Sequence, residues 1–351
     1  VEALYDATFD LMKWCSFDPP GGDPLGIPYD ANIQYCAYRK DFWDDPEEQK
    51  AFKDTYGYDL KVPETMEEMR DVAKFFTRPE EKMYGSTWNI KDYHGLMLWM
   101  HMYFDTGRDI LDKNLRPSFK SGTARDHAIK IAKFFQDGVF KEKWINPDSP
   151  MYETGGMCEY FMGGGAAIGI GWNADYHKDY NRPDMRAKLG KVESFEIPGP
   201  LGTPEKVGPG SGGLMAFWLW CLPKDSKHPD AAWEYIKWIV SEKPQWAMQG
   251  NMITPFKALA LRSVTETYPG TDITVNARAL YDAAMTARNH VPDGSWGRDY
   301  PKGVPEMTGK PNDEGARTWQ LMLAGQMTPE DWVDNYAKVI ETTLEATGKY
   351  Y

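Results

Sequence analysis

The stretch FMGGGAAIGIGWN at residues 161–173 decides the fold, because it is a strand of small residues that places an indole and an amide at its end. A Gly- and Pro-rich run follows at residues 198–213. The next segment, LPKDSKHPDAAWEYI at residues 222–236, contains a proline that begins an amphipathic helix. A strand, a crossing segment and a helix in this order are typical of a ligand cleft, and no candidate nucleophile lies nearby.

Length and charge restrict the class of protein. At 351 residues the chain is long enough for two lobes, since a domain typically holds roughly 100–200 residues. The formal net charge of -12 argues against a nucleic-acid partner, because such a partner requires a basic face. No run of apolar residues in the sequence approaches the ~18 that a membrane-spanning helix needs.

Aromatic residues are in excess, with 14 Trp, 20 Tyr and 15 Phe. The flat C–H faces of sugar rings pack against indole and phenol rings, and sugar hydroxyls need Asp, Asn, Arg or His as hydrogen-bond partners. The excess as a whole therefore favours a carbohydrate ligand. Any single ring is better explained by packing in the core or between lobes.

The sequence contains none of the common catalytic or metal-binding patterns. No nucleophile elbow, zincin motif, P-loop or dinucleotide-binding motif occurs, and no cofactor is predicted. The four cysteines lack metal-ligand spacing and specify no disulfide pairing; they are Cys15, Cys36, Cys158 and Cys221. A glycoside hydrolase that uses two carboxylates remains the alternative, although the sequence singles out no pair.

Helical and strand patterns alternate along the chain, which is typical of an α/β fold. Capping residues and prolines in first turns predict helix starts at Thr65, Asp92, Thr123, Pro229 and Thr328. Strands are predicted at residues 34–38 after a turn at Pro28, and at 85–90, 166–170 and 214–222. Both faces of the last segment are apolar, so we expect that strand to be buried.

Several segments together resemble the extracellular solute-binding proteins of ABC importers, in particular the carbohydrate family that includes maltose-binding protein. In chain order they are GIPYDANIQ at 26–34, YRKDFW at 38–43, FMGGGAA at 161–167, PKDSKHPDAAW at 223–233, NMITP at 251–255 and GQMTPED at 325–331. Each segment alone is weak evidence. Together they span most of the chain in the order of the family.

The resemblance implies a two-lobed, type II periplasmic-binding-protein fold with doubly wound α/β sheets and a ligand cleft between the lobes. It implies hinge closure on a sugar and delivery to the permease subunits of an ABC importer, without catalysis. We expect a monomer that works in the periplasm, or tethered outside the membrane, and whose export signal has been removed.

The resemblance also divides the chain into lobes. Residues 1–30 are expected to end the first lobe, 31–212 to form the second lobe, 213–268 to return to the first, and 269–351 to supply mainly C-terminal helices of the second. Family members open with about a hundred residues, a domain's worth of chain, before the first crossing. Only Val1 to Leu25 precede it here, so either the beginning of the chain is not included or the first lobe is reduced.

The first crossing segment holds one group of candidate ligand contacts. Alternation along a strand places Asp30, Asn32 and Gln34 on one face, with Tyr29 beside them. A structural strand does not bury such a polar set without partners. We therefore expect at least one of these side chains to contact the ligand.

A second group of candidates follows two of the predicted strands. On the resemblance, Trp172 is a stacking platform for the sugar, and Asn173 and Asp175 beside it bind hydroxyls; a core role for Trp172 is the alternative. Asp92 and His94 follow the strand at 85–90, where the family supplies hydrogen-bonding and stacking groups. Asp92 is explained equally well as the N-cap of the next helix.

The resemblance points to two further regions with weaker matches. The return crossing carries two small residues that let a ligand approach the backbone, and a hinge role is equally plausible there. A loop after the helix at 281–288 matches a third contact region. The candidates in these two regions are Gly212, Gly213, Trp218 and Trp296.

Overall fold

The computed structural model describes residues 2–8, 17–18, 23–104, 106–172, 192–199, 201, 215–248, 254, 256–265 and 309–348. Helices alternate with short strands along these ranges, so the fold is α/β as the sequence pattern predicts. Among the described helices, none is long and apolar enough to cross a membrane.

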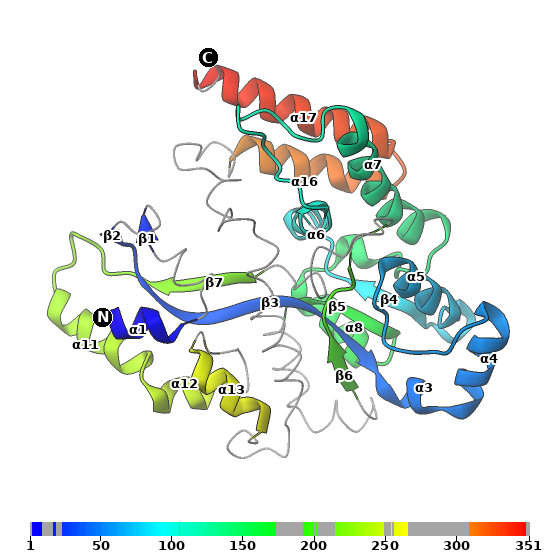
Figure 1. The fold of residues 1–351 in the computed structure, drawn as a ribbon, viewed down its shortest axis with the longest axis horizontal. Coiled ribbons are helices and arrows are strands. Elements are labelled where there is room, and N and C mark those ends of the chain that lie inside the picture. The colour runs from blue at the N-terminus through cyan, green and yellow to red at the C-terminus, as the bar shows by residue number, and fades with distance from the viewer. Residues whose placement is uncertain are drawn as a thin grey trace.

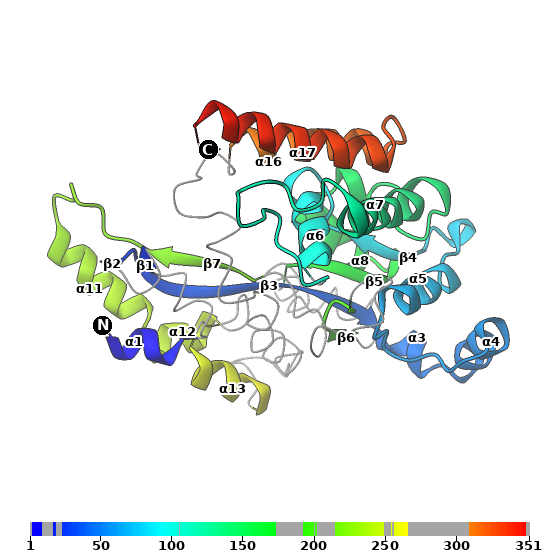
Figure 2. The same ribbon diagram turned by 45° about the horizontal axis from the view of Figure 1, so that its top comes forward.

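One long strand, β3 (Ile27–Arg39), connects the two parts of the sheet structure. Its first half pairs antiparallel with β7 (Met215–Trp220), whereas its second half pairs antiparallel with β5 (Ala166–Trp172) and β6 (Val192–Phe195). β4 (Tyr84–Trp88) lies parallel to the outer edge of β5. Figures 1 and 2 show β3 running across the width of the molecule.

The predicted turn at Pro28 is wrong, because β3 continues through it. Pro28 lies opposite Leu219 in the ladder with β7, and the register shifts between Pro28 and Asp30. Proline has no N–H for a ladder hydrogen bond, and a local irregularity of this kind lets a strand accommodate it. The polar residues of the crossing segment therefore stand on a strand and not on a loop.

Helices enclose the β4–β5 half of the sheet. Helices α5 and α8 contact its strands, α6 and α7 pack beside them, and α16 and α17 cover α6 and α7 (Figure 1). The bounds of these elements are α5 Met66–Phe75, α6 Tyr93–Phe104, α7 Gly122–Gln136, α8 Thr154–Met162, α16 Lys310–Leu323 and α17 Pro329–Ala346. At the far end of β3 lie α3 (Lys40–Asp44) and α4 (Pro46–Tyr56).

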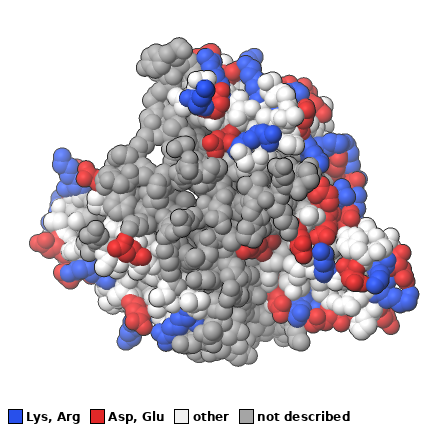
Figure 3. All heavy atoms as spheres, viewed as in Figure 1, with Lys and Arg blue, Asp and Glu red and all other residues white. Residues whose placement is uncertain are grey.

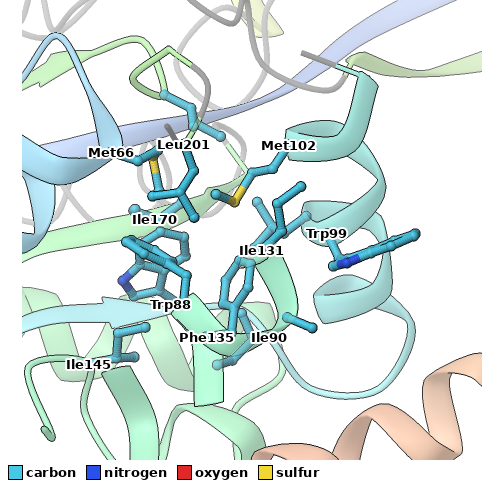
Figure 4. Close-up of a cluster of buried hydrophobic side chains, with 14 of the residues drawn as sticks. Met66, Trp88, Ile90, Trp99, Met102, Ile131, Phe135, Ile145, Ile170 and Leu201 are labelled. Carbon is cyan, nitrogen blue, oxygen red and sulfur yellow. The ribbon is translucent and has the colours of Figure 1, made fainter. Parts of the chain in front are cut away.

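Aromatic side chains fill the core of this half (Figure 4). The ring centroids of Trp99 and Trp332 lie 4.9 Å apart, and those of Trp319 and Trp332 lie 5.0 Å apart. Two buried indole N–H groups have acceptors: Trp99 Nε1 donates to the Ala128 carbonyl at 3.0 Å, and Trp88 Nε1 donates to Ser86 Oγ at 2.8 Å. Much of the aromatic excess is therefore packing, as expected for single rings.

Capping predicted from the sequence is confirmed at two helix starts. Thr65 Oγ1 accepts a hydrogen bond from the Glu68 N–H at 3.2 Å, and Thr328 Oγ1 accepts one from the Asp331 N–H at 3.0 Å. Helix α11 begins at Pro229, also as predicted. A close approach at Gly85 lets β4 pack on α5, because a Cβ there would lie 1.6 Å from the Ala73 carbonyl oxygen.

A smaller apolar cluster lies under the β7 half of β3 and joins Tyr5, Ile27, Ile236, Val240 and Phe256. The helices around it are α1 (Glu2–Ala7), α11 (Pro229–Ile239), α12 (Glu242–Met248) and α13 (Lys257–Thr265). A short hairpin of β1 (Phe17–Asp18) and β2 (Asp23–Pro24) stands beside them.

The expectation that the segment 214–222 is buried on both faces is wrong for part of it. Trp218 is 58% exposed, and Leu222 is also exposed. β7 lies at the edge of the described part of the sheet, since it pairs only with β3 among the described strands. Alternation of large apolar residues did not distinguish this edge from a central strand.

Positive and negative side chains are mixed on the surface of the described part of the chain. Figure 3 shows Lys and Arg interspersed with Asp and Glu on the face in view. Ion pairs such as Arg125 to Asp334, at 2.8 Å, join α7 to α17. Cys36 and Cys158 are buried, Cys221 is exposed, and Cys15 lies outside the described residues.

Candidate functional site

Polar side chains on β3 are buried without partners. Asp30 is 4% exposed and Gln34 is 0% exposed. Within the described part of the chain, Asp30 Oδ1 and both amide atoms of Gln34 make no hydrogen bond. Leaving one buried polar group unpaired typically costs ~1–3 kcal/mol, and most buried polar groups in proteins are paired. These atoms therefore have unused hydrogen-bonding capacity.

Trp172, at the end of β5, lies directly opposite Gln34 in the antiparallel ladder. Opposite residues of such a pair project from the same face with Cβ atoms ~4.5–5.5 Å apart. Trp172 is 5% exposed, and every other residue of β5 is buried as well. The strand of small residues thus brings an indole beside an unpartnered amide.

His94 holds the indole in place. Trp172 Nε1 donates a hydrogen bond to His94 Nδ1 at 3.2 Å, and the two ring planes meet at 67°. Nδ1 can accept only when it carries no proton, so the bond requires the neutral imidazole with its proton on Nε2. Burial lowers the pKa of His94 and favours this neutral form, although the charges of Glu153 and Asp92 act in the opposite direction.

The start of α6 positions His94. Asp92 precedes the helix with φ 47°, and its carbonyl accepts a hydrogen bond from the Leu96 N–H at 3.3 Å. Lys91 Nζ reaches Glu153 Oε1 at 2.8 Å and ties this turn to the residue preceding α8. The Asp92 side chain is exposed, and it lies immediately before the first residue of α6.

Asp30 extends the polar face toward β7. It lies opposite Trp218 in the β3–β7 ladder, and the Trp218 side chain is mostly exposed. Burial raises the pKa of Asp30 from 3.8 to about 7, because a carboxylate is destabilised where neither water nor a cation stabilises its charge.

Tyr29 is placed apart from this face. Its ring packs against Trp220 with centroids 5.1 Å apart, beside the smaller apolar cluster. Its carbonyl accepts a hydrogen bond from Gln245 Nε2 at 3.3 Å. The structure therefore brings together Gln34, Trp172 and His94. It places Asp30 four residues earlier on β3, opposite Trp218, and it places Tyr29 in the packing of the other part.

The remaining candidates fall outside the described residues. For Asn32 the backbone is described, and it lies opposite Ala216 in the β3–β7 ladder, but its side chain is not described. The other positions outside the described residues are Asn173, Asp175, Gly212, Gly213 and Trp296.

Two partners of the site were not predicted from the sequence. Lys91 and Glu153 form the ion pair that anchors the turn before α6, but they lie far apart along the chain. The bond between Trp172 and His94 likewise joins distant segments. Each of these contacts depends on tertiary packing, and no spacing rule could have found it.

Comparison with known families and structures identifies similar proteins. Residues 2–246 match the model of a family described as bacterial extracellular solute-binding protein. No curated protein matches the chain by sequence.

Solved structures resemble the fold over nearly the whole chain. A maltose-bound MalE3 of T. maritima has a TM-score of 0.63 at 19% identity and covers 92% of this chain and 73% of its own. An ABC transporter solute-binding protein from Agrobacterium radiobacter K84, in complex with ribitol, has a TM-score of 0.66 at 22% identity and covers 96% and 76%. One from Agrobacterium vitis S4, with bound D-mannitol, has a TM-score of 0.67 at 16% identity and covers 98% and 78%. The two-lobed type II fold predicted from the sequence is confirmed.

Proposed function

The chain belongs to the family of bacterial extracellular solute-binding proteins, and we propose that it captures a sugar or sugar-like polyol for an ABC importer. The observation that carries this proposal is the buried, unpartnered polar face of β3 beside the indole of Trp172. Amide and carboxyl groups without partners bind hydroxyls, and an indole face binds the C–H surface of a sugar or polyol. A polyhydroxylated molecule supplies both kinds of surface.

Each candidate residue except Tyr29 has a role in this binding mode. Trp172 provides the stacking surface for the ligand. The Gln34 amide donates one hydrogen bond to the ligand and accepts one, and Asp30 accepts hydrogen bonds from it. His94 fixes the orientation of the indole and so acts as a positioning residue. Further hydroxyl partners and backbone contacts come from Asn32, Asp92, Asn173, Asp175, Gly212, Gly213, Trp218 and Trp296.

Closure of the two lobes follows capture. The strand β3 passes from one part to the other, so a rotation at the crossing segments changes the distance between the lobes without breaking either core. Residues 31–212 and 269–351 form the larger lobe in this account, and residues 1–30 and 213–268 belong to the other. The closed shape is what the permease subunits recognise, and the receptor acts as a monomer in the periplasm or tethered outside the membrane.

Titration calorimetry tests the proposal. The trial ligands are ribitol, D-mannitol, D-tagatose, maltose and maltotriose, the compounds found bound in similar structures. Saturable binding at a stoichiometry of one by at least one sugar or polyol supports the proposal. Heats no larger than those of dilution for every compound in a wide panel of sugars and polyols contradict it.

The alternative, a carbohydrate-active enzyme, is tested in the same samples. A glycoside hydrolase cleaves its ligand by means of two carboxylates, whereas a receptor returns it unchanged. Chromatography of an oligosaccharide after prolonged incubation with the protein distinguishes the two. Recovery of intact oligosaccharide is expected. More moles of cleaved product than of protein would favour the enzyme.

A further inference from the structure

Asp30 is an isolated acid in the binding face. Among the described residues it is the only buried aspartate or glutamate. Its Oδ1 has no partner there, and Gln34 on the same face of β3 is also unpartnered. Buried carboxylates in proteins are ordinarily paired or protonated, so an apo site of this kind is prepared for a group that a ligand brings.

The described surroundings of Asp30 supply no positive charge. The paired strand β7 has the sequence MAFWLW and carries no ionisable residue. On β3 itself the neighbouring titratable group is Tyr29, whose pKa is raised first by burial and then by the Asp30 charge. Glu153 and Asp92, and not Asp30, are the charges that act on His94. The absence of a compensating cation leaves burial as the cause that raises the pKa of Asp30 to about 7.

We propose that Asp30 binds the ligand only as a carboxylate, so that capture of a sugar or polyol expels a proton from this side chain. This inference rests on the proposed function and adds a regulation to the same site. The proton leaves Asp30 for solvent, and hydroxyl groups of the ligand take its place as hydrogen-bond donors to the two carboxylate oxygens. Bonds to an ionised acceptor are stronger than bonds to a neutral one, which is why the ligand favours the deprotonated form.

Binding then depends on pH in a defined direction. In the free protein Asp30 is largely protonated below about pH 7, and in the complex its pKa falls toward the ordinary value. Affinity therefore rises with pH by up to ~10-fold per unit below neutrality and levels off above it. From pH 8.5 to pH 5.5 the dissociation constant is expected to increase about 30-fold, the fraction ionised being governed by a pKa of about 7.

Calorimetry on the wild-type protein is the test, with the tightest-binding sugar or polyol of the panel as the probe. Titrations at pH 5.5, 6.0, 7.0 and 8.5, roughly spanning the expected transition, measure the affinity. At pH 6.0, two buffers that differ in ionisation enthalpy measure the proton release directly. Neutral sugars and polyols do not titrate here, and release of close to one proton per ligand is expected ~1 unit below the pKa of the acid.

Two variants test whether the proton released on ligand binding comes from Asp30. Asp30→Asn keeps the size of the side chain and removes the charge, so binding is expected to become independent of pH above ~6.5, the ordinary pKa of histidine. Asp137→Asn changes a half-buried carboxylate that pairs with Lys133 and Lys141, and it is expected to retain the full pH dependence.

Failure of the inference and failure of the proposed function give different results. Binding that is equally tight at pH 5.5 and pH 8.5 without proton release, or that tightens as pH falls, overturns the inference and leaves the receptor function standing. Proton release that persists undiminished in Asp30→Asn also overturns it. No binding of any sugar or polyol at any pH refutes the receptor function and the inference together.

Discussion

Trp172 and Gln34 lie directly opposite each other across the antiparallel ladder of β5 and β3. Trp172 supplies a flat apolar ring, and Gln34 supplies an amide donor and acceptor that have no partner in the described structure. Because both stand on paired strands of one sheet, their relative positions are fixed before a ligand arrives. Such preorganisation reduces the entropy that binding costs, and it allows each contribution to be removed separately.

Replacing Trp172 with Ala is expected to weaken ligand binding by about 1–3 kcal/mol, because it removes the apolar contact surface of one large side chain. Calorimetry measures the change in the dissociation constant, about 5- to 150-fold. Trp238→Ala is the matched control, because Trp238 is exposed on α11. Equal affinity of Trp172→Ala and the wild type would remove Trp172 from the site.

Gln34→Met is expected to stabilise the unliganded protein while it weakens binding. The substitution removes two buried polar atoms that lack partners and replaces them with an apolar chain of similar length, which relieves a cost of about 1–3 kcal/mol. Thermal melts with and without ligand measure both effects.

Gln136→Met provides the opposite control for Gln34→Met. Gln136 Nε2 donates to the carbonyls of Met322 and Met327 at 2.7 and 3.0 Å. Its replacement removes both hydrogen bonds and takes this donor from the Met327 carbonyl, while the Met322 carbonyl keeps the Gly325 N–H, so the melting temperature is expected to fall. A Gln34→Met protein that melts lower than the wild type would show that the Gln34 amide has partners after all.

The hydrogen bond from Trp172 to His94 predicts that the fluorescence of the Trp172 indole depends on pH. Burial lowers the pKa of His94 below its ordinary 6.5, so the neutral ring that accepts the bond predominates at neutral pH. Protonation below that lowered pKa removes the acceptor, and the Trp172 environment changes. Comparing the fluorescence of wild type and Trp172→Phe between pH 8 and roughly pH 5, a range that extends below the ordinary histidine pKa, isolates the Trp172 signal.

His127→Ala is the control for that titration, since it changes a histidine that bonds Arg108. The transition assigned to Trp172 should persist in His127→Ala and vanish in His94→Ala. A transition that survives the loss of His94 would show that another group titrates beside the indole.

Helix α17 depends on its N-cap for part of its stability. Thr328→Ala removes the acceptor of the Asp331 N–H and is expected to cost about 0.5–2 kcal/mol of unfolding free energy. Thr342→Ala makes the same chemical change at an exposed position within the same helix. Denaturant unfolding should show a lower midpoint for the first variant only; equal midpoints would mean that the cap contributes nothing.

Local features of the fold could be predicted from sequence because they depend on neighbouring residues. The caps at Thr65 and Thr328 and the first turn at Pro229 are examples. The continuation of β3 through Pro28 could not be predicted, because a partner strand from residues 215–220 supports it. The exposure of Trp218 was missed for a related reason, since sheet order decides which strand forms an edge.

The candidate site could be predicted in part. Alternation along the crossing segment identified Asp30 and Gln34 as an improbable buried pair, and the structure buries both. The partnership of Trp172 with His94 required the packing of α6 against the end of β5. The sequence alone also did not separate Tyr29, which packs against Trp220, from its polar neighbours.

A crystal structure of the complex with the tightest-binding sugar or polyol tests the central claim most directly. The account predicts ligand density against the face of the Trp172 indole, with hydroxyl oxygens within hydrogen-bond distance of Gln34 and Asp30. Density for the ligand at another surface, with these two side chains still unpartnered or paired only with protein groups, would contradict it.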